Sequence, residues 1–576
     1  MRRLNIRLIA TLLVTAFILV FVVAGCTPKE EETTTKTDVT ATKEAEQETQ
    51  EEATEEKEEV IEPLGKFDPA VDVKVVNFTN STVQYRDGES ADNNVWINTY
   101  RDMLGINVEY IWIVDEAQFV QKMNVTIASN DLPDIFPVNG QQFVTLLDSE
   151  SLADLTDVYD KYISPQAVSI IDQDREVFNL GVKDGRLYAL PNTAGGSSID
   201  APAMLFVRED WRESLGLPKP ETMEDFFTIA EAFVTQDPDG NGADDTYALA
   251  LTKTLSRGDS GTGLQGFAGL QGFANAYHAY LGVWLEQEDG TAAYGSIQPE
   301  VKDMLLKLQE MYANGWLDKE FVVKDMAKVS ESTTNGTIGL EFGQMWNPFF
   351  PLQSTIENNN DAEWQPYPIP SVDGKPAKVS TAVSAANYWV VRSDYEYPEV
   401  AIRMLNLFTE KCWGETADND NYFNGDGATY VPFKYALVQA WPSLKNVDAH
   451  NHVVAAIESG DASALNAEEQ GYYAQATAYM ESGNPLDGWG ASKIFGQNAT
   501  FDVINYYLDN DLYLYDAYHN IPTPTMVEKG STLEKMENEV FTSIILGGDI
   551  SEFDKFVEDW KALGGNDMTD EINASR

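Results

Sequence analysis

The sequence predicts an α/β fold of two lobes, of which the C-terminal lobe is rich in helix. Strand and helix patterns alternate between residues 72 and 138, and helical periodicity dominates from about Leu205 onward. More than 500 residues follow the N-terminal segments, which is too many for a single hydrophobic core. Short strand-like segments recur at 339–340 and 388–391, so the chain is expected to leave one lobe and return to it. Several crossings between lobes are typical of a hinge.

In the first lobe the pattern predicts strands at 72–78, 106–113 and 134–138. A helix over 91–104 ends at Gly105, and Asp115 caps a second helix that runs to about Ser129. This order is typical of a doubly wound sheet, in which ligands bind beyond the carboxyl ends of the strands. Tyr85 follows the first strand and Asn139 the third, so both become candidate ligand contacts.

Helical periodicity in the remaining chain predicts seven longer helices: 221–235, 299–314, 398–411, 466–482, 498–508, 533–546 and 551–563. We assign 67–195 with 336–390 to the N-terminal α/β lobe, and 196–335 with 391–576 to the C-terminal helix-rich lobe.

The first 25 residues form a predicted signal peptide. Arg2, Arg3 and Arg7 precede an uncharged apolar run that ends in Val23-Ala24-Gly25-Cys26. The last four residues resemble the bacterial lipobox, in which cleavage leaves a lipid-modified cysteine. We therefore expect a lipid anchor on Cys26 and a location on the extracellular face of the cell membrane. The alternative is an uncleaved membrane-spanning helix.

Residues 26–66 are expected to be the lipidated cysteine and a disordered acidic tether. Positions 27–62 hold fourteen Asp or Glu and four Lys, which is too polar a composition to form a core. The whole chain has a formal charge of −54, and a surface this negative repels phosphate backbones. Nucleic acid is therefore excluded as a partner, and a monomer is expected.

Residues 237–248 resemble a calcium loop. Calcium prefers six to eight oxygen ligands, and EF-hand loops supply them from alternate positions around a glycine at position 6. Here Gly242 occupies position 6, and the predicted ligands are Asp237, Asp239, Asn241, Ala243 through its carbonyl, Asp245 and Thr246. Position 12 is Ala248, so the bidentate glutamate is absent. An ion-free turn rich in Asp and Asn is the alternative to a structural Ca²⁺.

An ordered set of short motifs surrounds this loop: Phe206-Val207-Arg208-Glu209-Asp210-Trp211-Arg212, Leu215-Gly216-Leu217-Pro218, Thr222-Met223-Glu224-Asp225-Phe226, and Pro398-Glu399-Val400-Ala401-Ile402-Arg403. Together they resemble family 1 of the bacterial extracellular solute-binding proteins, in its lipoprotein and alginate-binding branch. The resemblance implies a type II periplasmic-binding-protein-like fold that closes on a solute, most often an oligosaccharide. It also implies an ABC permease, through its transmembrane subunits, as the partner.

Sugar recognition needs flat aromatic faces and planar polar groups. Trp346 and Asn347 lie in Gln344-Met345-Trp346-Asn347-Pro348, where the proline forces an irregular loop after a strand. Trp284 and Trp489 are further candidates, and Arg208 is a candidate clamp for an anionic sugar. For each tryptophan a place in the core is the alternative, and for Arg208 an ion pair with its acidic neighbours is the alternative.

No catalytic residues are predicted. The sequence lacks a phosphate-binding Gly-Lys-Ser/Thr loop, a His-Glu-x-x-His helix and a Gly-x-Ser-x-Gly elbow. With 93 acidic residues, pairs of carboxylates arise by chance and do not indicate a glycosidase. A secreted carbohydrate-active enzyme and a surface sensor or adhesin remain the alternatives to a transport receptor.

Overall fold

The computed structural model describes residues 62–79, 83–193, 199–200, 202–255, 268–381, 383, 385, 387–425, 430–519 and 522–575. The predicted signal peptide, Cys26 and most of the predicted tether lie outside these residues.

The first sheet has five strands in the order β2-β1-β3-β14-β6. β1 is parallel to both β2 and β3, whereas β14 runs antiparallel to β3 and β6. The strands are β1 (Val71–Thr79), β2 (Ile106–Asp115), β3 (Ile135–Val138), β6 (Ala189–Pro191) and β14 (Tyr388–Val391). The predicted strands at 72–78, 106–113, 134–138 and 388–391 are therefore confirmed.

Local signals explain where the helices beside this sheet begin and end. Asp115 caps α3 by accepting a hydrogen bond from the backbone of Ala117, and Asn139 forms a capping box with Gln142 at the start of α4. The predicted helix before Gly105 is α2 followed by a π-helical turn at Tyr100–Leu104, and it ends at this glycine with φ +68°. The helices are α2 (Val95–Thr99), α3 (Glu116–Ala128), α4 (Gly140–Asp148), α5 (Thr156–Tyr162), α6 (Pro165–Ile171), α7 (Arg175–Asn179), α14 (Glu399–Trp413) and α15 (Asn419–Tyr422).

The second sheet has four strands in the order β12-β7-β11-β8. β7 and β11 are buried on both faces, so no alternation of polar and apolar residues marks them in the sequence. The strands are β7 (Met204–Arg208), β8 (Tyr247–Leu249), β11 (Ile338–Gly343) and β12 (Trp364–Tyr367). Three further strand pairs are short: β4 (Val182–Lys183) with β5 (Arg186–Leu187), β9 (Trp284–Glu286) with β10 (Ala292–Tyr294), and β13 (Val379–Thr381) with β15 (Tyr513–Tyr515).

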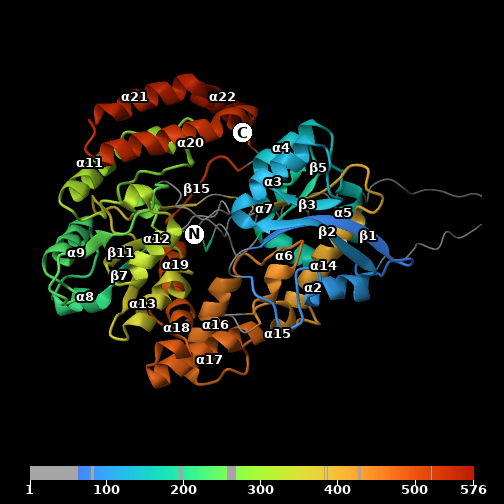
Figure 1. Cartoon of the computed structure of the whole chain (residues 1–576), viewed down its shortest axis with the longest axis horizontal. Coiled ribbons are helices and arrows are strands. Elements are labelled where there is room, and N and C mark those ends of the chain that lie inside the picture. Colours follow the sequence, from blue (N-terminus) through green and yellow to red (C-terminus); the bar gives the residue numbers. More distant parts are fainter. Residues whose placement is uncertain are drawn as a thin grey trace, which may run out of the picture. The chain divides into compact units, whose positions relative to one another are not determined.

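Helices make up most of the second lobe. Figure 1 shows α20, α21 and α22 beside one another near the C-terminus, and α16, α17 and α18 as a second group. The helices are α8 (Glu209–Ser214), α9 (Met223–Thr235), α10 (Gln271–Ala276), α11 (Glu300–Ala313), α12 (Met326–Thr334), α13 (Gln353–Asn358), α16 (Lys445–Ser459), α17 (Ala467–Ser482), α18 (Trp489–Phe495), α19 (Thr500–Asp509), α20 (Pro524–Ile545), α21 (Ser551–Trp560) and α22 (Asn566–Ser575). The helix-rich C-terminal lobe of the prediction is confirmed, and all seven predicted helices occur within α9, α11, α14, α17, α19, α20 and α21 or one turn beyond.

The predicted lobe boundaries need correction. Residues 336–390 were assigned to the first lobe, but β11 and β12 pair with β7 in the second sheet. Conversely α14 and the chain up to Trp441 pack into the core of the first sheet. The reason is that a strand buried on both faces carries no mark of the sheet it joins, because its partners are set by tertiary contacts.

Among the described residues, three chain segments connect the two lobes. The first leads from β6 to β7, the second from β13 to β14, and the third from Trp441 to α16. Cys412 lies in the core of the first lobe at 8 % exposure, as expected for a small apolar side chain.

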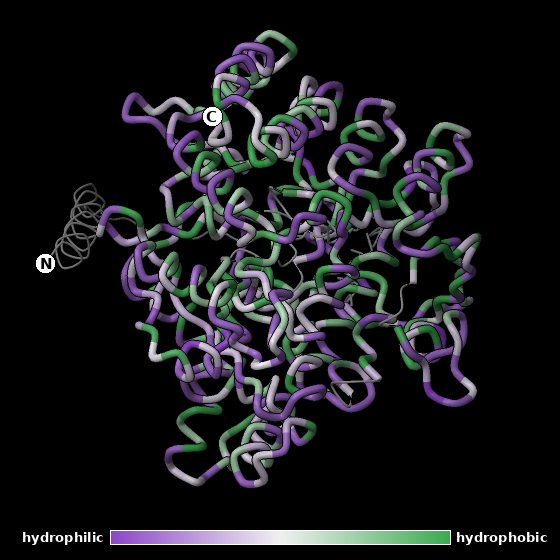
Figure 2. Tube along the Cα trace, turned by 60° about the vertical axis from the view of Figure 1, so that its left-hand side comes forward, coloured by the Kyte–Doolittle hydropathy of each residue, from purple (hydrophilic) through white to green (hydrophobic). Residues whose placement is uncertain are grey.

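Hydrophobic and hydrophilic residues alternate along the helices, as the hydropathy colours in Figure 2 show. Within the described ranges, no helix combines the length and the apolar character needed to cross a bilayer.

Candidate functional site

The candidate site begins at one edge of the first sheet. The carboxyl ends of β1 and β3 lie at this edge, and Tyr388 at the start of β14 pairs with Val138 and Pro191, which end β3 and β6. The first and second crossings leave the sheet here. The rule that ligands bind beyond the carboxyl ends of parallel strands therefore points toward the second lobe.

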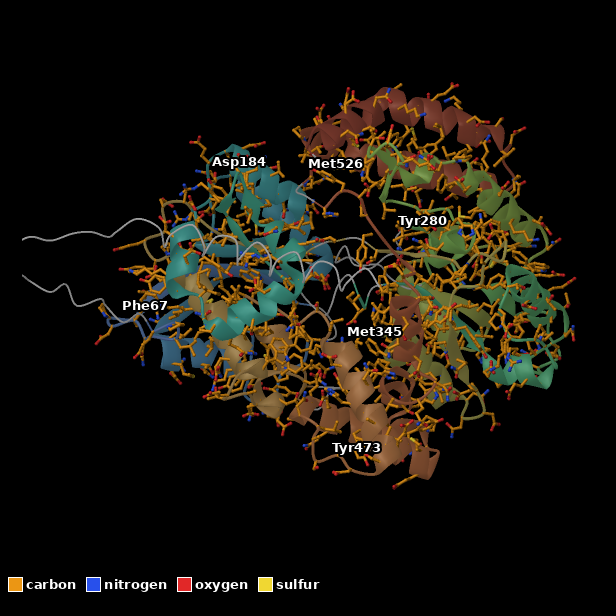
Figure 3. All side chains as sticks on the ribbon, turned by 180° about the vertical axis from the view of Figure 1, so that it is seen from behind. Phe67, Asp184, Tyr280, Met345, Tyr473 and Met526 are labelled. Atoms are coloured by element: carbon orange, nitrogen blue, oxygen red, sulfur yellow. The ribbon has the colours of Figure 1, made fainter. Side chains whose placement is uncertain are left out.

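The corresponding edge of the second sheet also adjoins the crossings. Met204 begins β7 directly after the first crossing and pairs with Gly343, the last residue of β11. The loop that follows Gly343 contains Trp346, so this loop lies at the edge of the second sheet nearest the first lobe. Met345, labelled in Figure 3, marks the same loop.

Contacts between the two lobes place α4 next to α20. A Cβ atom built on Gly140 would lie 3.2 Å from Pro522, which precedes α20. Val527 of α20 packs against the core cluster that contains Phe143 and Tyr388. The loop after β3 is therefore held against the second lobe, as the strand-end rule predicts.

Tyr85 belongs to an aromatic group beyond the carboxyl end of β1. Its ring stacks on Tyr435 with a centroid distance of 4.8 Å, and the guanidinium of Arg86 lies 3.8 Å from the ring centroid of Tyr430. Tyr85, Tyr435 and Lys434 line a notch of about 20 Å³, which holds one group the size of a water molecule. Tyr85 is only half-buried, so the placement of Tyr85 by the strand-end rule is compatible with ligand contact.

Tyr430, Tyr435 and Arg86 were not among the predicted site residues. Tyr430 and Tyr435 lie more than 340 positions from Tyr85 along the chain, so no local signal in the sequence connects them with it. Arg86 donates hydrogen bonds to Asn421 Oδ1 at 3.2 Å and to the carbonyl of Asp420 at 3.3 Å, which joins the two segments.

Trp346 is partly exposed, and hydrogen bonds and packing hold the loop that contains it. The indole Nε1 donates to Gln344 Oε1 at 2.8 Å, and the side chain packs against the cluster that contains Ala250 and Ala268. Asn347 is completely buried: its Oδ1 accepts from the backbone of Gln344 at 2.7 Å and its Nδ2 donates to Glu341 Oε1 at 2.8 Å. Asn347 therefore shapes the loop and does not reach a solute, contrary to the prediction.

Glu341 is fully buried beneath this loop. Burial raises the pKa of its carboxyl to about 8, although hydrogen bonds from Thr333 and Asn347 act in the opposite direction. A neutral carboxyl group in β11 therefore holds Asn347, and through it the loop of Trp346.

Two predicted tryptophan contacts are buried in the second lobe. Trp489 has no exposed surface and donates to Glu363 Oε2 at 3.2 Å, and Trp284 is 4 % exposed between Tyr294 and Trp560. These tryptophans are core residues, which was the alternative reading of each.

Arg208 is an ion-pair residue and not a clamp for a sugar. It is 2 % exposed, and its guanidinium makes two hydrogen bonds of 2.9 and 2.7 Å to the carboxylate of Asp210. Trp211 also covers it, with 4.2 Å between the guanidinium carbon and the ring centroid. The sequence contained the signal, since Asp210 is two residues away.

Asn139 lies at the predicted edge but already has a structural role. Its side chain accepts from the backbone of Gln142 at 2.9 Å and so caps α4. The side chain of Asn139 is partly exposed, so its amide group is open to contact with a solute.

A larger groove lies at the opposite edge of the first sheet. It measures about 850 Å³ and is lined by Lys74, Glu109, Asp134, Arg392 and other polar residues. Its size exceeds that of the notch at Tyr85, but it is remote from the crossings. Closure of two lobes acts on residues beside the crossings, so the notch at Tyr85 and not this groove belongs to the candidate site.

The predicted calcium loop after α9 forms a tight, exposed turn. Asp237, Gly240 and Gly242 have positive φ angles, and Asp237 Oδ2 accepts from the backbone of Gly242 at 3.1 Å. Partial burial, together with the carboxylates of Asp237 and Asp245, raises the pKa of Asp239. The carboxylates therefore repel one another, as expected for a site that a cation would neutralise.

The oxygen atoms of these side chains are the ligands that a hard cation prefers, but the described side chains are not arranged around a common point. Asn241 directs its amide nitrogen toward Asp239 and Asp245, and within the described ranges no three acidic, histidine or cysteine side chains converge on a common point. The hydroxyl of Thr246 donates to the carbonyl of Phe233 at 2.7 Å, so this side-chain oxygen is not directed at the loop. Ala243 presents only its backbone.

Two sheet-based lobes, joined by three crossings and facing each other through their strand ends, define a two-lobed solute-binding protein. The model of the bacterial extracellular solute-binding protein family matches residues 95–412, more than half of the chain. The chain belongs to this family, whose members are binding proteins found outside the cytoplasm.

Relatives agree with this assignment. Lipoprotein LipO of Bacillus subtilis is 22% identical over 489 residues, which are 84% of this chain and 89% of LipO. The structure of alginate-binding protein AlgQ2 without calcium ion matches with a TM-score of 0.59 at 13% identity, covering 89% of this chain and 99% of AlgQ2. The structure of the Streptococcus pneumoniae ABC-transporter substrate-binding protein FusA with kestose matches with a TM-score of 0.59 at 16% identity, covering 88% and 98%.

Proposed function

We propose that this chain is the substrate-binding lipoprotein of an ABC importer and that it captures an oligosaccharide between its two lobes. The observation that carries the proposal is the pair of facing sheet edges, each with a partly exposed aromatic side chain: Tyr85 beyond β1 and Trp346 beyond β11. Aromatic faces pack against the C–H surfaces of sugar rings.

Two similarities support an oligosaccharide as the solute. FusA was solved in complex with kestose, and AlgQ2 is an alginate-binding protein. The chain is expected to bind without turnover, since members of its family are binding proteins.

The proposed location is the extracellular face of the cell membrane, through lipid on Cys26. The acidic tether then holds the protein near the transmembrane subunits of its permease, where a tethered receptor has a high effective concentration. The proposed receptor acts as a monomer.

Calorimetry with a panel of oligosaccharides that includes kestose tests the binding proposal. The expected result is saturable heat with one site per chain and no change in the sugar during prolonged incubation. Absence of heat across neutral and acidic glycans would contradict the proposal, and release of shorter sugars would favour the enzyme alternative.

Uptake by cells tests the transport proposal separately. Deletion of the chain should abolish uptake of the sugar that binds, and Cys26→Ser should release the protein into the medium. Uptake that survives deletion would point to a sensor or adhesin.

We also propose a structural Ca²⁺ in the loop 237–246, held by Asp237, Asp239, Asn241, Asp245 and the carbonyl of Ala243. Binding requires that Asn241 turn its amide oxygen toward the carboxylates. The ion would supply charge neutralisation and would fix the end of α9.

A further inference from the structure

Asp200 is an unusual residue in the first crossing between the lobes. Its side chain is 6 % exposed, and Oδ2 accepts a hydrogen bond of 2.6 Å from Nδ2 of Asn446. Oδ1 is also buried and has no hydrogen-bond partner among the described residues. A buried polar atom without a partner is costly, so its retention calls for a physical reason.

The bond to Asn446 connects two of the three crossings. Asp200 belongs to the segment that leads into β7, and Asn446 lies in the first turn of α16, directly after the third crossing. On the side of the first lobe the same two crossings are joined by Thr193 Oγ1, which accepts from the backbone of Trp441 at 2.7 Å. The two crossings are therefore pinned to each other at both ends.

The second crossing is tied to the same point. Tyr513 donates its hydroxyl to the carbonyl of Ile199 at 2.7 Å, and Tyr513 pairs with Val379 through the short sheet of β13 and β15. β13 leads into the second crossing. Ile199 and Asp200 thus form the position at which all three crossings are connected.

The charges around Asp200 do not compensate it when it is ionised. The Lys445 ammonium binds Glu468 Oε1 at 2.6 Å, and Glu468 also accepts from the hydroxyl of Tyr472 at 2.6 Å. Both partners of this ion pair are nearly buried, and Tyr472 and Tyr513 are neutral phenols near Asp200. Lys445 and Glu468 cancel each other, so an ionised Asp200 adds one uncompensated negative charge to this buried group.

We propose that Asp200 is the residue that positions the hinge and that one proton on its carboxyl controls the equilibrium between lobe arrangements. The protonated carboxyl is compatible with the buried position of Asp200 between the crossings in this structure. The ionised carboxyl favours an arrangement in which Oδ1 is hydrated, which requires the crossings to separate. The inference rests on the crossings themselves and not on the identity of the solute.

The pKa of Asp200 falls where such a control would operate. Burial raises the pKa to about 7, against the opposing effects of the hydrogen bond from Asn446 and the charge of Lys445. The arrangement described above is therefore favoured below about pH 7 and disfavoured above it.

Fluorescence energy transfer between the lobes tests the proposal without any solute. One dye is placed at Lys183→Cys in β4 and the other at Lys535→Cys in α20; both positions are exposed. The full chain also carries Cys26→Ser, and Cys412 is buried and remains unlabelled. Transfer efficiency is then measured from pH 5.5 to 8.5.

The expected result is a change in transfer efficiency with a midpoint near pH 7. Asp200→Asn should remove the transition and keep the value found at low pH, because an amide cannot ionise. Asn446→Ala should move the midpoint to higher pH, since the lost hydrogen bond no longer favours the ionised carboxyl. Asp318→Asn is the matched control: Asp318 is a buried aspartate of the second lobe, outside the crossings, that pairs with Lys324, and this variant should keep the transition.

The proposal is overturned if the efficiency of the unmodified pair is independent of pH, or if Asp200→Asn keeps the transition. An unchanged midpoint in Asn446→Ala would equally contradict it. Thermal melting of each variant confirms folding, and if Asp200→Asn does not fold, the shift in Asn446→Ala decides alone. Because no sugar is present, these outcomes are independent of whether the proposed solute is correct.

Discussion

Replacement of Glu341 by glutamine should make the stability of the second lobe less dependent on pH. Glu341 has no exposed surface, and burial raises its pKa from 4.5 to about 8. In the unfolded chain the carboxyl loses its proton near pH 4.5, whereas in the folded chain it keeps the proton to about pH 8. The folded state therefore binds more protons across this window, and stability falls as the pH rises through it.

The magnitude follows from the difference between the two pKa values. Each pH unit within the window costs about 1.4 kcal/mol of unfolding free energy. Between pH 5 and pH 7.5 the loss attributable to Glu341 is therefore about 3 kcal/mol. Glutamine has the same shape: its carbonyl can accept from Asn347 and its amide can donate to the hydroxyl of Thr333, but it cannot ionise.

Urea unfolding followed by tryptophan fluorescence at several values between pH 5 and pH 7.5 measures the effect. The two proteins should have similar stability at pH 5, and Glu341→Gln should be more stable by about 3 kcal/mol at pH 7.5. The matched control is Glu331→Gln in α12, because Glu331 is exposed and its ion pair with Lys328 lowers its pKa. Parallel stability curves for the original chain and Glu341→Gln would refute a neutral buried carboxyl.

Three further predictions follow from the site. Trp346→Ala should weaken oligosaccharide binding at least tenfold in calorimetry, with little change in melting temperature. Trp489→Ala should instead lower the free energy of unfolding in urea by about 3–5 kcal/mol, since it empties a core position. Equal effects of the two variants on stability would contradict the assignment of Trp346 to the ligand site and Trp489 to the core. Arg208→Met should destabilise the chain by about 3–5 kcal/mol, because it leaves the carboxylate of Asp210 partly buried and without its ion-pair partner. A change in binding preference from acidic to neutral sugars with unchanged stability would instead support the prediction that Arg208 binds an anionic sugar. Chelation should lower the melting temperature, and Asp239→Ala should remove this sensitivity; if no metal copurifies and chelation has no effect, residues 237–246 are an ion-free turn.

Signals local in the chain predicted the elements of the first lobe well. Asp115 and Gly105 act on the nearest backbone groups, so the start of α3 and the end of the helical segment before Gly105 follow from neighbouring residues alone, whereas α4, which Asn139 caps, was not predicted. The long amphipathic helices α9, α11 and α17 were predictable for the same reason.

Assignments that depend on distant partners were not predictable in this way. β11 is buried along its whole length although it contains Glu341, and its position between β7 and β8 depends on residues more than 80 positions away along the chain. Trp284 and Trp489 were candidates beside Trp346, yet both are buried, whereas Trp346 is partly exposed at a sheet edge. Whether an aromatic side chain is buried depends on which elements cover it, and this information is not local.

The position of β14 affects how the protein is made. In the first sheet this strand lies between β3 and β6, which precede it in the sequence by about 250 and about 200 residues. During synthesis the first lobe lacks its penultimate strand until the four strands of the second sheet and helices α8 to α13 have been made. Contacts this distant in sequence slow folding, because loop closure precedes the energy they provide. For a chain with a predicted export signal this delay is an advantage, since a polypeptide that has not closed its first sheet can still pass extended through a secretion channel.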